Sequence, residues 1–198
     1  MERLLMTQAN LMKDKHVRVQ EDSKVVKLQK ANVGSLCEFK TALQDSFRVA
    51  AEADLGKALE EPIPSDEDIE QSIAADGAVT YWIMVNELRV GGAVMVIDEI
   101  SNRNSLSFFF ISTSQQSRGL GLQAWEAIER EYPKTKIWET VTPYFEKRNI
   151  HFYVNRCGFK IVEFYNKFHP DPNQASVQAH QEEGEDEMFR FMKVMEHK

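Results

Sequence analysis

The sequence predicts an α/β fold: a mixed, mainly antiparallel sheet of six to seven strands with helices on both faces. Three observations lead to this prediction. Apolar runs at residues 79–85, 89–97 and 105–111 are separated by short polar joints, as in an antiparallel meander. Apolar side chains then recur at helical spacing over residues 120–132. A fifth strand is expected at 136–141, and because a crossover helix precedes it, the fourth and fifth strands should be parallel neighbours.

One strand and two helices are expected before this meander. Residues 24–29 alternate in polarity well enough for a first strand. Apolar residues at helical spacing over residues 36–50 predict a helix with one buried stripe. Ser65 is followed by acidic residues and predicts the capped start of a second helix, which should end near Ala75.

The last part of the chain adds a helix and two strands. Residues 144–157 are predicted to form a helix that ends at Gly158, since glycine is common just beyond a helix. The apolar runs 159–165 and 188–195 should close the sheet as a hairpin. Their connector, residues 166–187, is long and rich in acidic residues. Disorder or simple solvation is its plain interpretation, and a lid over the acceptor is the alternative.

Length and composition limit the class of protein. A chain of 198 residues with 42% hydrophobic residues is expected to form one domain at 24–198, after an N-terminal extension at 1–23. We find no apolar run long enough for a membrane span, no signal-peptide pattern and no metal-ligand spacing around the cysteines. A cytoplasmic protein without a metal site is expected. The net charge of −7 argues against nucleic acid as a partner.

A polar turn with two glycines separates the fourth predicted strand from the helix that follows it. Gly119 and Gly121 remove side chains there, so backbone N–H groups of residues 116–122 can converge on one anion. A phosphate-bearing ligand is the functional interpretation, and an ordinary strand-to-helix turn is the alternative. A dinucleotide site is disfavoured, because its glycine loop follows the first strand of a parallel βαβ unit and this turn follows a meander.

Two motifs lie in order around this turn and the helix after the fifth strand. The first is Gln116-Ser-Arg-Gly119-Leu-Gly121, which has the form Gln/Arg-x-x-Gly-x-Gly/Ala. The second runs from Asn149 to Phe159 and combines a Phe-Tyr pair on a helix with a Gly-Phe that enters the next strand. Together they resemble the GNAT superfamily of acetyl-CoA-dependent N-acetyltransferases. The resemblance covers residues 79–165 and implies the GNAT fold, with acetyl-CoA as co-substrate.

The resemblance also implies which residues contact the donor. The turn would hold the pyrophosphate, and the pantetheine arm would lie between the fourth and fifth strands. The expected contacts are Phe109, Phe110, Ile111, Gln116, Ser117, Arg118, Gly119, Leu120, Gly121, Leu122, Asn149 and Phe152. The chain departs from the family pattern in having Glu146 where an asparagine often contacts the donor, and Asn149 where a small residue is frequent.

Tyr153, in the second motif, is the expected general acid. A phenol with an ordinary pKa of about 10 can protonate a leaving thiolate, and members of the family commonly use this tyrosine in that way. The alternative is a core aromatic residue with a satisfied hydroxyl. For the base that deprotonates the amine, Glu139 is the first candidate and Glu99 the second, with an ordinary exposed or paired carboxylate as the alternative for each. His151 is expected at the surface.

These expectations describe an N-acetyltransferase that moves the acetyl group of acetyl-CoA directly to a primary amine of a small molecule or peptide. The competing class is a non-catalytic CoA-binding sensor or interaction module, which needs the phosphate turn but not Tyr153. The acidic runs 64–70 and 182–187 favour a small amine with a second positive charge, whereas solvated surface is their plain interpretation. A monomer or homodimer without a membrane or nucleic-acid partner is expected.

Overall fold

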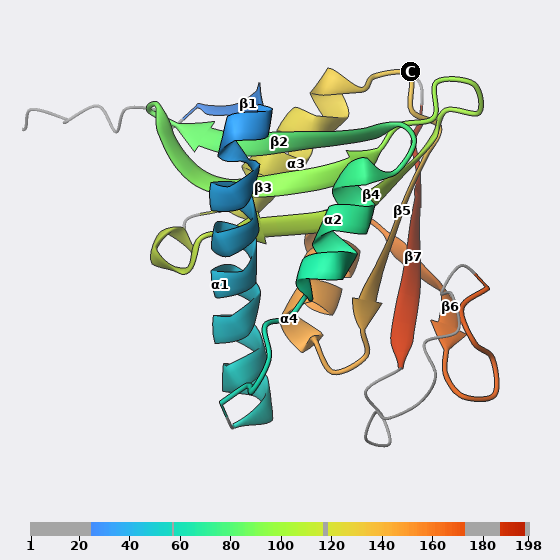
Figure 1. The fold of residues 1–198 in the computed structure, drawn as a ribbon. Coiled ribbons are helices and arrows are strands. Elements are labelled where there is room, and N and C mark those ends of the chain that lie inside the picture. The colour runs from blue at the N-terminus through green and yellow to red at the C-terminus, as the bar shows by residue number, and fades with distance from the viewer. Residues whose placement is uncertain (1–24, 57, 117–118, 173–186, 197–198) are drawn as a thin grey trace, which may run out of the picture.

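The computed structural model describes residues 25–56, 58–116, 119–172 and 187–196. Within them, seven strands form one sheet in the order β1-β2-β3-β4-β5-β7-β6 (Figure 1). Neighbouring strands are antiparallel, except that β4 and β5 are parallel. The predicted fold class is therefore confirmed. The strands are β1 Val26–Lys30, β2 Ala78–Val85, β3 Leu88–Val96, β4 Arg103–Ile111, β5 Ile137–Pro143, β6 Lys160–Tyr165 and β7 Met188–Val194.

Helices lie on both faces of this sheet (Figure 1). On one face, α1 and α2 pack on β2, β3 and β4, and on the other face lie α3 and α4. Each face of the sheet has its own hydrophobic core, and successive side chains of β2 enter the two cores in turn. Tyr81 belongs to the cluster under α3, and Trp82 to the cluster under α1. No described helix is long and apolar enough to cross a membrane. The helices are η1 Val33–Ser35, α1 Leu36–Leu55, α2 Asp66–Ala74, η2 Thr113–Gln115, α3 Leu120–Glu131, α4 Lys147–His151 and the π-helix η3 Phe152–Arg156.

Two of the predicted helix boundaries are confirmed in detail. Ser65 caps α2, because its Oγ accepts a hydrogen bond from the backbone N–H of Asp68 at 3.1 Å. Gly158 follows η3 with a φ of 79°, a left-handed conformation that costs glycine little. Residues 1–23, the expected extension, lie outside the described residues.

The predicted single helix over residues 144–157 was wrong at its start and in its last turn. The backbone N–H of Tyr144 donates to the carbonyl of Glu187 at 2.8 Å, which extends the pairing of β5 with β7 and leaves α4 to begin at Lys147. Farther along, the N–H of Cys157 donates to the carbonyl of Phe152 at 3.0 Å. That bond spans five residues, so the helix widens into a π turn.

The sheet opens between β4 and β5. These strands pair only over three residues each, from Arg103 to Ser105 and from Ile137 to Glu139. Beyond them the hydroxyl of Thr140 donates to the carbonyl of Leu106 at 2.8 Å, so a side chain takes the place of a backbone bond. The rest of β4 therefore pairs with β3 alone and keeps its other edge available.

Candidate active site

A cavity of about 570 Å³ lies at the end of β4, beside this opening. Its walls come from the end of β4, the turn after it, the first turn of α3, and the segment from Glu146 to η3. Ser46, Phe47 and Val49 of α1 complete the wall from the other face of the sheet. The cavity thus draws walls from both faces, and its volume lies in the range of small-molecule sites.

The cavity brings together the two motifs that the sequence singles out. Glu139 and Glu99, the two candidate bases, are not among its lining residues. Ser117 and Arg118 lie outside the described residues. The expected donor contacts that do line the cavity are Phe109, Phe110, Ile111, Gln116, Gly119, Leu120, Gly121, Leu122, Asn149 and Phe152.

The two glycines of the turn meet different requirements. Gly119 is the N-cap of α3 and has a φ of 71°, while a Cβ built there would meet nothing within 4 Å. Its role is to turn the chain into the helix. A Cβ on Gly121 would instead lie 3.2 Å from the ring of Phe152, so this glycine permits close packing. Because the first N–H groups of a helix have no partner within it, the turn supplies donors for an anion.

Phe152 and Tyr153 place two aromatic rings in the cavity wall. Phe152 stacks on Phe109, with ring centroids 5.6 Å apart and planes inclined by 13°. Tyr153 is 7% exposed and packs edge to face on Phe159. Burial raises the pKa of Tyr153 above its ordinary value, and a hydrogen bond with Thr140 acts in the opposite direction. The phenol therefore keeps its proton at neutral pH. Its hydrogen bond with Thr140 of β5 places it at the opening between β4 and β5.

A comparison with known families shows to which family the chain belongs. Residues 48–168 match the family described as "Acetyltransferase (GNAT) domain". The chain belongs to the GNAT family of acetyltransferases. The matched segment of this GNAT protein contains the glycine turn, both strands of the opening and Tyr153.

The chain is also similar to individual proteins and solved structures. The protein is 45% identical over 185 residues to the uncharacterized protein YrkN of Bacillus subtilis (strain 168), a match that covers 92% of this chain and 100% of YrkN. Among solved structures, a GNAT family acetyltransferase from Elizabethkingia anophelis with acetyl-CoA bound is 14% identical, with a TM-score of 0.62 and coverage of 86% of this chain and 99% of that one. Arabidopsis thaliana Naa50, in complex with the bisubstrate analogue CoA-Ac-MVNAL, is 13% identical, with a TM-score of 0.54 and the same two coverages, 86% and 99%. At such identities, the two structures show a shared fold.

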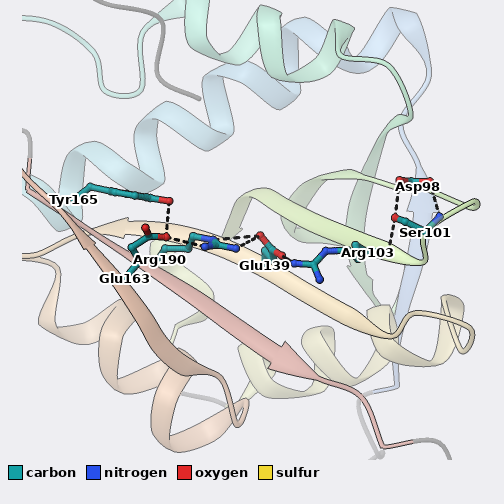
Figure 2. Close-up of polar contacts among 7 residues, drawn as sticks. All are labelled: Asp98, Ser101, Arg103, Glu139, Glu163, Tyr165 and Arg190. Atoms are coloured by element: carbon teal, nitrogen blue, oxygen red, sulfur yellow. Dashed lines mark hydrogen bonds and ion pairs between the residues drawn. The ribbon is translucent and has the colours of Figure 1, made fainter. Parts of the chain in front are cut away.

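Glu139 of this GNAT protein is held by two cations. Trp138 packs on Trp125 of α3, so Glu139, the next residue of β5, points to the opposite face. Its carboxylate pairs with Arg103 of β4 and with Arg190 of β7, the latter at 3.0 Å (Figure 2). These contacts fit the alternative interpretation, a paired carboxylate. A role as the base stays a prediction, as it does for Glu99, which is exposed after β3.

The same face carries a longer series of polar contacts, which we call the polar row. Arg190 also pairs with Glu163 of β6 at 2.7 Å (Figure 2). Hydrogen bonds from His169, Arg190 and Tyr165 lower the pKa of Glu163 to about 2. The members of the polar row are Arg103, Glu139, Arg190, Glu163, Tyr165 and His169.

Several residues of the cavity wall were not predicted as site residues, and Glu146 and Arg148 make hydrogen bonds there. Glu146 is 6% exposed, and one of its carboxylate oxygens accepts a hydrogen bond from Asn149 at 3.0 Å. Arg148 donates from Nη1 to Oε1 of Gln116 at 2.7 Å, while Nε2 of Gln116 donates to the carbonyl of Ile111 at 3.1 Å. Arg148 thus links the second motif to the glycine turn. Its place in the predicted helix, one residue before the second motif, was the only signal in the sequence.

Proposed function

We propose that this protein transfers the acetyl group of acetyl-CoA to a primary amine by direct attack of the amine on the thioester. One observation carries the proposal: a single cavity holds both the glycine turn and the buried phenol of Tyr153. The structures solved with acetyl-CoA and with a CoA bisubstrate analogue support this choice of donor, since they share the fold. A cytoplasmic location belongs to the same proposal.

The donor would bind along the cavity from the turn to the opening. The first N–H groups of α3 and the positive end of its helix dipole would hold the pyrophosphate. The free edge of β4 after Leu106 would pair with the amides of the pantetheine arm. This brings the thioester next to Tyr153, with a backbone N–H near Phe110 available to its carbonyl oxygen.

The chemistry then needs one proton donor on the protein. The amine nitrogen bonds to the thioester carbonyl carbon, the intermediate loses an amine proton to water or a base, and the carbon–sulfur bond breaks. Tyr153 gives its proton to the departing sulfur and regains one from solvent, so the products are an N-acetylated amine and CoA thiol. Burial, which raises the pKa of Tyr153, keeps the phenol protonated before this step.

The acceptor is proposed to be a primary amine of a small molecule or a peptide. The acidic start of α2 gives less support to a cationic acceptor than its sequence suggests. Lys40 pairs with Asp66 at 2.9 Å and with Glu70 at 3.1 Å, so two of its acids already have a cation. Of the acidic run 182–187, only Glu187 lies within the described residues.

Release of CoA thiol tests the proposal directly. The protein is incubated with acetyl-CoA and a panel of monoamines, polyamines, aminoglycosides and peptides with free N-termini. We expect thiol release that depends on one class of amine, together with a rise in melting temperature on addition of acetyl-CoA alone. A rise in melting temperature without turnover of any amine would favour the non-catalytic CoA-binding module instead.

A further inference from the structure

Three basic side chains share one wall of the cavity, and the mechanism above uses none of them. Arg148 and His151 belong to α4, and Arg156 ends η3. All three line the cavity and are exposed to solvent. They lie together in a chain whose net charge is −7, so the general charge balance does not account for this group.

The π turn places these side chains on one side of the helix. In a regular α-helix, residues eight positions apart differ by about 80° in direction. The bond from the N–H of Cys157 to the carbonyl of Phe152 takes up one extra residue, so the eight positions from Arg148 to Arg156 cover about two full turns. The widened turn therefore brings Arg156 back over Arg148, with His151 between them.

The basic group also stands next to the glycine turn without being part of it. Arg148 reaches Gln116, the first residue of the turn, through a hydrogen bond of 2.7 Å to a neutral amide oxygen. The backbone N–H groups of the turn and of α3 can account for one anion, the diphosphate. CoA carries a second anion, a phosphomonoester on its ribose, with a charge near −2 at neutral pH.

We propose that Arg148, His151 and Arg156 bind the 3′-phosphate of the donor's ribose and make the protein select CoA donors over their dephospho forms. This inference rests on the proposed function, because it takes acetyl-CoA as the donor. Two guanidinium groups can each make paired, charge-assisted hydrogen bonds to a phosphate. The simpler alternative is that the cations attract any anionic ligand from a distance, which would affect both donor forms alike.

Acetyl-CoA and acetyl-dephospho-CoA differ only in this phosphate, and the test compares them. We expect the parent to show a KM about tenfold or more higher for the dephospho donor, with a similar kcat. Arg156→Gln should raise the KM for acetyl-CoA several-fold and leave the KM for the dephospho donor nearly unchanged. Arg156→Lys should restore part of the preference. Arg148→Gln with Arg156→Gln should bring the two KM values close together.

A matched control removes a cation elsewhere. Arg130 lies exposed in the last turn of α3, outside the cavity wall, so Arg130→Gln makes the same change in charge and should keep the donor preference. Equal KM values for both donors in the parent would overturn the inference. So would an Arg156→Gln variant that weakens both donors by the same factor.

A binding measurement separates this inference from the proposed function. Calorimetric titration with CoA and with dephospho-CoA needs no turnover. If no amine is acetylated but CoA binds more tightly than dephospho-CoA and Arg156→Gln removes the difference, the proposed transfer reaction fails and the phosphate site stands. If amines are acetylated and the two nucleotides bind equally, the reverse conclusion holds.

Discussion

Tyr153 and Glu139 could both move a proton, but they lie on opposite faces of the sheet in opposite surroundings. Tyr153 is 7% exposed, lines the cavity and keeps its proton because burial raises its pKa. Glu139 lies outside the cavity wall, with its carboxylate between Arg103 and Arg190. The difference separates a buried phenol at the cavity, which we propose as the general acid, from a carboxylate whose ion pairs fit a structural role.

The largest expected effect comes from removing the phenol. Tyr153→Phe should lower kcat by about 10- to 10⁴-fold with little change in the KM for acetyl-CoA, because a general acid is lost and no donor contact is removed. The measurement is steady-state thiol release with the best amine of the panel. Thr140→Val serves as a control for the local hydrogen bond and should have a smaller effect. A Tyr153→Phe variant with the kcat of the parent would show that Tyr153 is not the general acid.

The second effect concerns donor binding on the same side. Gly121→Val would push a branched side chain against Phe152, since even a Cβ there lies 3.2 Å from that ring. We expect a loss of most of the acetyl-CoA-induced rise in melting temperature, and a loss of about 1–3 kcal/mol in the free energy of unfolding of the free protein. Gly119→Ala is the matched control: it strains a left-handed residue, costs about 1 kcal/mol and places its Cβ within 4 Å of no other side chain, including Phe152. Similar donor responses from both variants would show that crowding at Phe152 is not what matters.

The third effect concerns Glu139, on the face of the sheet opposite Tyr153. Glu139→Gln should lower kcat by less than about tenfold and the free energy of unfolding by about 0.5–1 kcal/mol, because it weakens two partly exposed ion pairs. Arg190→Gln should lower stability in a similar way without a larger effect on kcat. A fall in kcat as large as that of Tyr153→Phe, with stability unchanged, would assign Glu139 the role of base after all.

The part of the cavity wall that the two motifs form could be predicted from sequence because its signals are local. Gly119 and Gly121 lie within one turn, and each answers a backbone or packing demand that few other residues meet. Tyr153 follows from its place in a motif with fixed spacing. The fold class was predictable for the same reason, since a meander followed by a crossover helix leaves little choice of strand direction.

The polar row could not be predicted because its contacts are distant in sequence. Glu139 meets Arg190 only because β7 inserts between β5 and β6, and the register of that pairing is not written in either segment alone. The π turn was missed for a related reason. The π turn begins at Phe152, whose ring packs on Phe109 and next to Gly121. These contacts are distant in sequence, so local propensity does not reveal the turn.

The smallest expected effect is the response of the polar row to acid. The pKa of Glu163 is lowered to about 2 in the folded protein, from an ordinary value of 4.5. A carboxyl group with a lowered folded-state pKa stabilises the fold above its unfolded-state pKa, and this stabilisation is lost as the pH falls toward 2. The melting temperature of the parent should therefore drop between about pH 5 and pH 2, and Glu163→Gln should flatten part of that drop.

Melting curves of parent and variant across this pH window provide the measurement. Glu60→Gln, at an exposed position away from the polar row, is the matched control and should follow the parent. Because Glu163 is partly exposed, raising the salt concentration should reduce the difference in melting temperature between parent and Glu163→Gln at pH 6.

Catalysis should respond differently: kcat at neutral pH should be nearly the same in parent and Glu163→Gln, since no member of the polar row lines the cavity. Parallel melting curves for parent and Glu163→Gln, or a large loss of kcat in that variant, would remove the contrast between a structural face and a catalytic one.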